Sequence, residues 1–301
     1  MNNRIKRFLY AVFRRIIVKP LLRKGLGSIP FIAAAYKFIE GAILPNGQKM
    51  VIVNGCKMMT RYGGVGQSLI YDGEYEPQTT AIFKELVKPK MKVVDIGANN
   101  GYFTLLASKL VGAEGEVLAF EPEQRNFDDL MQNINLNKSA NVVSVRKAVG
   151  DRNIETVMFT SDVEPGECSL FQCYPSNKNM VKVEMVKLDS VLNGKVDIVK
   201  SDTEGNELGV LLGAEQLLAG CADVKLILEF FPIGFKAAGY SIKELWKVLH
   251  RYDFLYMYLI DEKARRTKLI TLDGIERYSK RFGGTNVLCV KEPIEGIPYE
   301  L

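Results

Sequence analysis

The chain has 301 residues, of which 47% are hydrophobic and 25% are charged. This length and composition are typical of a globular protein with a full apolar core, and they exclude a disordered or fibrous chain. Five cysteines without a CxxC pair argue against a disulfide framework or a zinc ribbon and favour a reducing compartment such as the cytoplasm. The single histidine, His250, argues against a His-ligated metal site, a Ser-His-Asp triad or a Cys-His dyad. Any general base is therefore expected to be a carboxylate, a lysine or a tyrosine.

The net charge of +5 is unevenly distributed along the chain. Residues 1–44 contain nine basic side chains and one acidic side chain, Glu40, and so carry +8. The rest of the chain contains 31 basic and 34 acidic residues, which gives −3. A mildly acidic body does not suit a nucleic-acid groove, and we expect no nucleic-acid partner.

Residues 1–44 are predicted to form a basic amphipathic helical arm. Their apolar residues recur at helical spacing at Ile5, Phe8, Leu9, Val12, Phe13 and Ile16. One interpretation is a helix lying on an anionic membrane surface, which would make the protein a peripheral membrane protein. Another is a helix packed on its own domain or on a second copy in a homodimer. A mitochondrial transit peptide is a third, weakened because no serine precedes Ser28. No uncharged apolar run is long enough to span a bilayer.

Residues 45–74 are predicted to form a small β-ribbon that leads into the main domain, with strands over Met50–Val53, Cys56–Arg61 and Ser68–Tyr71. From residue 75 to residue 301, predicted strands and helices alternate. This alternation predicts an α/β domain with a mostly parallel, Rossmann-like sheet and helices on both faces.

In chain order, the predicted elements of this domain are the strand Lys92–Ile96, the helix Tyr102–Val111, the strand Glu116–Phe120, the helix Arg125–Asn137, the strand Val142–Arg146, the extended segments Ile154–Phe159 and Val181–Leu188, the strand Val196–Ser201, the helix Glu207–Leu218, the strand Lys225–Phe230, the helix Ile242–Arg251, and the strands Phe254–Ile260 and Asn286–Val290.

A turn rich in small residues, Asp95–Gly101, joins the first predicted strand to its helix, and Glu121 ends the next strand. Dinucleotide sites and S-adenosylmethionine sites share two features. Small residues precede a helix N-terminus, and a carboxylate about 20 positions later accepts hydrogen bonds from the hydroxyls of a ribose. A GxGxxG motif starting at Gly97 is broken by Asn99 and Tyr102, and no GxxxxGK[ST] motif is present. The cofactor without a pyrophosphate, S-adenosylmethionine, therefore fits better than NAD. The alternative is that Glu121 merely caps the following helix.

These residues resemble the FkbM-type S-adenosylmethionine-dependent methyltransferases. The resemblance covers about residues 75–291 and rests on Tyr75-Glu76-Pro77, Val94–Gly101, Phe120-Glu121-Pro122, Asn133–Asn137, Ala148–Asp151, Leu188-Asp189, Lys200–Glu207 and Asn286-Val287-Leu288. It implies a class I methyltransferase fold and O-methylation of a hydroxyl on a sugar, a lipid-linked glycan or a polyketide. Thr203 departs from the family pattern, in which an apolar residue is common at this place in DxEG. The arm lies outside the resemblance.

The resemblance also implies roles for individual residues. The methionine part of the cofactor would be held by the first strand end and turn, that is by Asp95, Gly97, Ala98, Asn99 and Gly101. Glu121 would bind the ribose, and Asp151 would face the adenine amine, unless Asp151 is only a turn residue before Arg152. Glu76 would bridge toward the cofactor from the preceding loop.

Methyl transfer to a hydroxyl benefits from a group that takes the proton. The strand Val196–Ser201 delivers Asp202 and Glu204 to the carboxyl edge of the sheet, where open α/β sheets bind ligands. Asp202 is the first candidate for the base or the acceptor-orienting residue, with Glu204 and Glu229 in support. The alternative for Asp202 and Glu204 is capping of the following helix. The same carboxylates could hold Mg²⁺, although a metal is not required by the chemistry.

An alternative from another class is a membrane-tethered scaffold that keeps a methyltransferase-like fold without turnover. The intact turn Gly97–Gly101 and Glu121 argue against this alternative. An NAD-dependent oxidoreductase is disfavoured by Asn99 and Tyr102. We expect a small-molecule or glycan acceptor whose pocket walls come from residues Ser161–Asn179 and Arg265–Gly284.

If the arm binds membranes, the full chain is expected to co-sediment with anionic liposomes, because basic side chains are attracted to a negatively charged surface. Binding should fall as salt rises from 50 to 500 mM, since salt screens such charges. Equal sedimentation of a chain without residues 1–44 would refute the membrane interpretation.

Overall fold

The computed structural model describes residues 47–61, 63–161 and 166–294. The predicted arm lies outside the described residues, and so its three interpretations stay predictions. Within these ranges, none of the helices combines the length and the apolar character that a membrane span needs.

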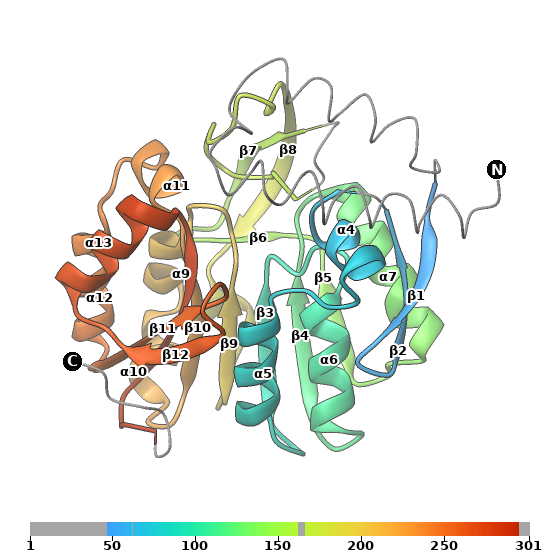
Figure 1. The fold of residues 1–301 in the computed structure, drawn as a ribbon, viewed down its shortest axis with the longest axis horizontal. Helices are drawn as coiled ribbons and strands as arrows, with labels where there is room; N and C mark the ends of the chain where they lie inside the picture. Colours follow the sequence, from blue (N-terminus) through green and yellow to red (C-terminus); the bar gives the residue numbers. More distant parts are fainter. Residues whose placement is uncertain (1–46, 62, 162–165, 295–301) are drawn as a thin grey trace.

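An eight-stranded sheet forms the centre of the fold, with the strand order β12-β11-β13-β10-β9-β3-β4-β5 (Figure 1). Its neighbouring parallel strands are β5 (Val142–Val145), β4 (Glu116–Phe120), β3 (Lys92–Ile96), β9 (Ile198–Ser201) and β10 (Lys225–Phe230). The other three strands pair antiparallel with their neighbours and are β13 (Thr285–Val290), β11 (Tyr256–Asp261) and β12 (Arg266–Leu269). The predicted α/β class with a mostly parallel sheet is confirmed.

Helices cover both faces of this sheet and bury two apolar clusters against it. The first cluster contains residues of α8 (Leu188–Val191), α9 (Glu207–Gly213), α10 (Glu215–Gly220), α11 (Pro232–Ala237), α12 (Ile242–Arg251) and α13 (Leu272–Phe282). The second contains residues of α4 (Gly64–Tyr71), α5 (Pro77–Leu86), α6 (Tyr102–Val111), α7 (Gln124–Asn137) and the antiparallel ribbon of β1 (Lys49–Val53) and β2 (Cys56–Thr60).

The two-residue period of the strands decides which side chains face which cluster. In β3, Val94 and Ile96 face the first cluster, whereas Val93 faces the second. Asp95 shares the Val93 side and is paired in register with Lys200 of β9. Two charged residues thus lie on the face that α5 and α6 cover, inside strands that are otherwise apolar.

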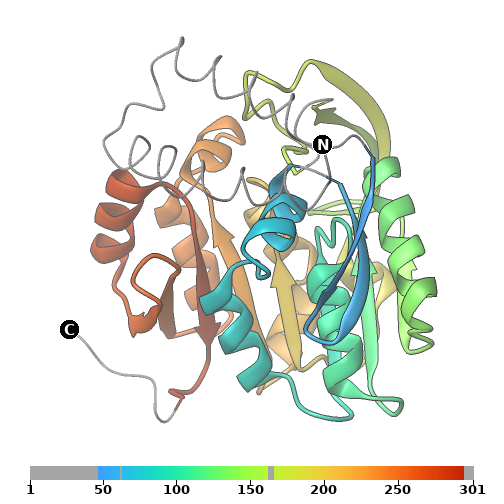
Figure 2. The ribbon, with the colours of Figure 1, turned by 45° about the vertical axis from the view of Figure 1, so that its right-hand side comes forward.

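A separate three-stranded sheet, β6-β8-β7, lies beyond the carboxyl end of the parallel strands (Figures 1 and 2). Its strands are β6 (Ala148–Val149), β7 (Ile154–Thr160) and β8 (Asn179–Val186). It has a small apolar cluster of its own, formed by Ala148, Met158, Val183 and Met185.

Five elements have the predicted bounds, namely β3, α6, β4, β10 and α12. The predicted strand Ser68–Tyr71 is wrong, since these residues complete helix α4. Gly66 explains this helix: a Cβ there would lie 1.8 Å from the carbonyl oxygen of Arg61, so only glycine permits the close packing. The predicted helix Glu207–Leu218 is two helices, because Gly213 packs against the carbonyl of Gly150 and Ala214 leaves helical geometry.

Candidate functional site

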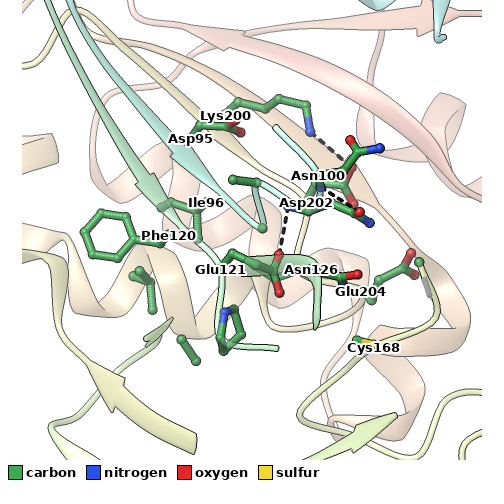
Figure 3. Close-up of a pocket in the computed structure, with 18 of the residues that line it drawn as sticks. Asp95, Ile96, Asn100, Phe120, Glu121, Asn126, Cys168, Lys200, Asp202 and Glu204 are labelled. Carbon is green, nitrogen blue, oxygen red and sulfur yellow. Dashed lines mark hydrogen bonds and ion pairs between the residues drawn. The ribbon is translucent and has the colours of Figure 1, made fainter. Parts of the chain in front are cut away.

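A cavity of about 380 Å³ opens at the carboxyl ends of β3, β4 and β9 (Figure 3). Its floor is formed by the turn after β3, the end of β4 and the loop after β9. Its opposite wall comes from β6, β7 and residues 166–170, which lie within the predicted wall segment Ser161–Asn179. The volume and the position at this sheet edge are those of a small-molecule site.

The turn after β3 is held against both neighbouring strands. The N–H groups of Gly97 and Ala98 donate to the carbonyl of Phe120 over 2.9 and 3.0 Å. Gly97 has φ +79°, and a Cβ there would lie 1.9 Å from the carbonyl oxygen of Asp202. Asn99, also with positive φ, lines the cavity together with Gly97 and Ala98. Glycine at position 97 is therefore required both by conformation and by close packing.

Glu121 stabilises this turn through hydrogen bonds to the main chain. It is 4% exposed, and its two carboxylate oxygens accept from the N–H groups of Asn99 (2.8 Å) and Glu123 (2.9 Å). Burial raises the pKa of Glu121 to about 7, although these two N–H groups oppose the rise. Each oxygen keeps a second lone pair with which it can accept a ligand hydroxyl.

Asp95 is the most deeply buried charged residue in the cavity wall, at 1% exposed. One oxygen accepts from the Thr104 hydroxyl over 2.6 Å, and the other has no hydrogen-bond partner among the described residues. Burial raises the pKa of Asp95, and the ammonium of Lys200 opposes the rise. A buried acceptor without a donor in a cavity wall favours a positively charged or hydrogen-bond-donating ligand. The ammonium and sulfonium groups of S-adenosylmethionine have that character, so the residues fit the predicted cofactor.

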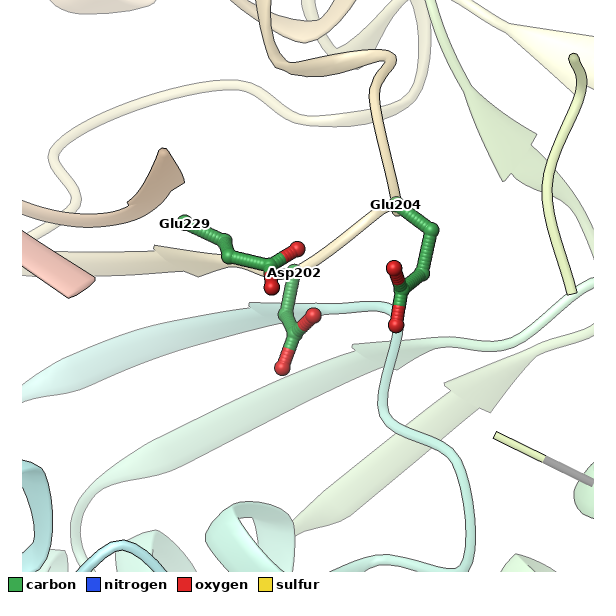
Figure 4. Close-up of side chains that lie close together, drawn as sticks. All are labelled: Asp202, Glu204 and Glu229. Atoms are coloured by element: carbon green, nitrogen blue, oxygen red, sulfur yellow. The ribbon is translucent and has the colours of Figure 1, made fainter. Parts of the chain in front are cut away.

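Three carboxylates meet at the edge of this cavity (Figure 4). Each of Asp202, Glu204 and Glu229 has an oxygen within 4.8 Å of the other two. Asp202 and Glu204 line the cavity, whereas Glu229 lines a second cavity next to it. The predicted catalytic residues are therefore brought together. We call these three residues the acidic cluster.

Lys200 balances part of the negative charge of the acidic cluster. This 2% exposed side chain donates to Asp202 Oδ2 over 3.0 Å, and its Nζ lies 4.6 Å from the centroid of the Phe103 ring. Burial lowers the pKa of Lys200, but Asp202, Glu76 and Asp95 together raise it further, so the ammonium keeps its charge. Lys200 was not predicted as a site residue. The sequence does contain a signal for this role, which is a lysine inside the apolar strand Ile198–Ser201. A lysine buried in a strand needs a charged partner, and so indicates acidic residues nearby.

The other members of the acidic cluster hold their protons more strongly than ordinary glutamates. Burial, followed by the charge of Asp202, raises the pKa of Glu204 to about 8. Burial and the neighbouring Glu204 and Asp202 raise the pKa of Glu229 well above its ordinary value. The hydroxyl of Tyr174 donates to Glu204 Oε2. Glu204 can thus accept or release a proton near neutral pH.

Glu207, which was not predicted, fixes the loop that carries the cluster. Its Oε1 accepts from the N–H (2.9 Å) and the hydroxyl (2.7 Å) of Thr203, and its Oε2 accepts from the N–H of Gly205 (3.1 Å). The threonine that departs from the family pattern therefore has a structural role, because its hydroxyl gives Glu207 a third donor.

Three predicted cofactor residues do not line the main cavity. Asp151 pairs with Arg152 over 2.7 Å, and Lys147–Val149 line the cavity in its place, so a contact with adenine does not follow from this arrangement. Gly101 does not line the cavity but packs against the side chain of Leu130, where a Cβ would lie 2.7 Å from a Leu130 methyl carbon. Glu76 lines the second cavity with Glu229.

The raised pKa values predict a stability cost that can be measured. Between pH 4.5 and about 8, folded Glu204 holds a proton that the unfolded chain has lost, so stability should fall as pH rises through this window. Glu204→Gln removes the ionisation and should raise the free energy of unfolding at pH 8.5 by at least about 1 kcal/mol, with a smaller gain at pH 5. Urea unfolding at both pH values measures this. The exposed Glu85→Gln is the control, and equal gains for both variants would contradict the prediction.

Comparison with known proteins places this site in a family. A family model described as "Methyltransferase FkbM domain" matches residues 95–256. No curated protein matches the chain.

Solved structures of methyltransferases align with the chain at low identity. A methyltransferase FkbM from Methylobacillus flagellatus is 16% identical with a TM-score of 0.41, and the alignment covers 74% of this chain and 52% of that one. The chain thus spans about half the length of that protein. A SAM-dependent methyltransferase from Aquifex aeolicus is 16% identical (TM-score 0.40, 70% and 88% covered). A putative methyltransferase from Streptococcus mutans, solved in complex with SAH, is 9% identical (TM-score 0.42, 72% and 97% covered).

The family model covers more than half of the chain, and its match begins at Asp95, the residue that opens the turn of the main cavity. This chain therefore belongs to the FkbM methyltransferase family, with S-adenosylmethionine as its methyl donor.

Proposed function

We propose that the protein is an O-methyltransferase that acts on a hydroxyl of a sugar, a lipid-linked glycan or another small hydroxylated molecule. The observation that carries this proposal is the acidic cluster at the edge of the main cavity. A hydroxyl is a weak nucleophile that must lose its proton during transfer, and carboxylates placed beside it can take that proton.

The residues divide into a binding group and a proton-handling group. Asp95, the turn around Gly97 and Glu121 would hold the cofactor, which supplies a methyl group activated by a sulfonium. The positive charge of that group would be matched by Asp95 Oδ1, which has no hydrogen-bond partner among the described residues. Holding donor and acceptor side by side supplies much of the rate enhancement, because it replaces a bimolecular encounter.

Asp202 would orient the acceptor hydroxyl and take its proton. Its Oδ2 is held by Lys200, which leaves Oδ1 available for the acceptor. Glu204 and Glu229 would support this role, and Glu204, whose pKa burial raises to about 8, could pass the proton on to solvent. The oxygen of the acceptor would form the new bond to the methyl carbon while the bond from that carbon to the sulfonium sulfur breaks. The hydroxyl proton would go to the Asp202 carboxylate, and S-adenosylhomocysteine would be the leaving group.

Asp202→Asn keeps the size of the side chain and removes the base. We expect the rate of methyl transfer to fall about 100-fold or more, the usual range for a lost general base. The affinity for S-adenosylhomocysteine should change less than twofold, as measured by calorimetric titration. The control is Asp223→Asn, whose carboxylate is 80% exposed. Full activity of Asp202→Asn, measured with labelled methyl groups on an accepted substrate, would remove Asp202 from the mechanism.

The role of Glu121 predicts a pH dependence of cofactor binding. A carboxylate accepts ribose hydroxyls better when it is ionised, and the pKa of Glu121 is about 7 in the protein without ligand. Affinity should therefore rise about tenfold between pH 6 and pH 8, as expected when binding requires loss of a proton with this pKa. Calorimetric titration of S-adenosylhomocysteine measures this. Glu121→Gln should bind more weakly and with a flatter pH profile, and an unchanged profile in this variant would contradict the assignment.

A further inference from the structure

A second cavity of about 140 Å³ lies on the other side of the acidic cluster. It is bounded by the N-terminal end of α5, the ends of β10 and β13, the turn after β11 and the C-terminal end of α13. Glu229 lines this cavity, and its carboxylate is within 4.8 Å of Asp202 and Glu204, which line the main one. A group bound here is therefore next to the residues that would take the proton.

Strand register explains why polar side chains gather at this place. Glu229 of β10 is paired with Asn286 of β13, and Leu228 is paired with Ser201, so Asp202 follows in line with Glu229. Side chains in one row across neighbouring strands share a face of the sheet. Asp202, Glu229 and Asn286 thus form a polar row that runs from one cavity to the other.

Two acceptor atoms in this row lack donors. Asn286 is 4% exposed, and its Nδ2 donates to Glu76 Oε2 over 3.0 Å and to the hydroxyl of Thr79 over 3.1 Å. Its Oδ1 is buried and has no hydrogen-bond partner within the described part of the chain, and the same holds for Glu229 Oε2. Buried acceptors cost free energy until a donor reaches them. The cavity therefore favours a ligand that carries hydrogen-bond donors.

Glu76 is held beside Asn286 in an unfavourable conformation. It has φ +42°, which is uncommon for a residue with a side chain, and it directly precedes α5. Both oxygens of Glu262 accept from the first N–H groups of α5, on Gln78 and Thr79, and so fix this end of the helix. A strained residue that its surroundings hold in place is typical of a functional site.

The charge of the second cavity opposes anions. Its wall contains the carboxyl groups of Glu76, Glu229 and Glu262 and a single basic residue, Lys263. The ammonium of Lys263 lies over the ring of Phe282, 4.7 Å from the centroid. An acceptor with a carboxylate or phosphate would place its charge beside the Glu262 carboxylate and would further oppose the ionisation of Glu76 and Glu229, whose pKa values burial already raises, and this disfavours its binding. The aromatic rings of Tyr278 and Phe282 give the cavity an apolar side.

We propose that this second cavity is the acceptor site, and that it selects an uncharged polyhydroxyl head group over a carboxylated or phosphorylated one. This inference rests on the proposed methyl transfer to a hydroxyl. Hydroxyl hydrogens would fill the free lone pairs of Asn286 Oδ1 and Glu229 Oε2. The cavity volume corresponds to roughly four or five water molecules of about 30 Å³ each, which suits one small head group with the rest of the acceptor outside.

The test compares neutral and acidic sugars on the full chain saturated with S-adenosylhomocysteine. The probes are the methyl glycosides of glucose, galactose, mannose and rhamnose, and those of glucuronic and galacturonic acid, at up to 50 mM in saturation-transfer NMR. At least one neutral glycoside is expected to bind at least tenfold more tightly than its uronic counterpart. Binding of none of the neutral glycosides, or equal binding of the uronic acids, would overturn the proposal.

Variants locate the bound sugar in the second cavity. Phe282→Ala and Asn286→Asp should each weaken binding of the neutral glycoside at least fivefold and leave S-adenosylhomocysteine affinity within twofold. Lys280→Ala, on the same helix and exposed, is the matched control and should change neither. Phe282 is 40% exposed, so its truncation tests the site even if Asn286→Asp does not fold. Undiminished sugar binding in Phe282→Ala would place the sugar elsewhere and overturn the proposal.

The proposed methyl transfer and the assignment of the second cavity can be disproved separately. If S-adenosylhomocysteine does not bind the parent chain, the proposed methyl transfer fails. If it binds and the sugars do not, only the assignment of the second cavity fails.

Discussion

The close approach of Gly97 to the backbone of Asp202 is the constraint on which both halves of the site depend. Gly97 follows β3 and Asp202 follows β9, and the N–H of Asp202 donates to the carbonyl of Ile96 over 3.0 Å. Any side chain at position 97 would meet the carbonyl of Asp202. The turn that would hold the cofactor and the loop that carries the acidic cluster are therefore fixed to each other by main-chain contacts, which vary little with side-chain motion.

The site contains buried acidic groups that the fold alone does not require. Burial raises the pKa of Glu76, Glu121 and Glu207 to about 7 each, so ionising any of them above that pH costs the folded state free energy. The buried ammonium of Lys200 offsets part of this cost for Glu76. Groups that lower stability and converge on cavities are expected where function, and not folding, has determined the residue.

The sequence predicts the central strands well because their patterns are local. The apolar run of β3, the small residues after it and the acid at the end of β4 define the turn, Asp95 and Glu121 without knowledge of the fold. The convergence of Asp202 and Glu204 on the same cavity follows from the rule that parallel strands present their carboxyl ends at one edge. Helix α4 is missed because its N-terminal glycines have low helix propensity, and packing overrides that propensity.

The second cavity could not be predicted in the same way. It depends on β13 entering antiparallel between β10 and β11, which pairs Asn286 with Glu229 across 57 positions of sequence. The resemblance implies that Asp151 contacts adenine, but the Asp151 carboxylate pairs with the adjacent Arg152 and does not line the main cavity. Both results depend on which residues meet in space, and periodicity along the chain does not contain that information.

The small sheet β6-β8-β7 has a consequence for how this protein can evolve. It contributes Ala148, Val149 and Met158 to the wall of the main cavity. Ala148 and Met158 belong to its own apolar cluster, whereas Val149 belongs to the first cluster of the large sheet. Substitutions of Ala148 and Met158 can therefore reshape this wall at less cost to the stability of the central strands than substitutions of Val149. One wall of the main cavity can thus change by gradual mutation, while the turn around Gly97 and the acidic cluster, which lie at the ends of strands of the large sheet, are kept.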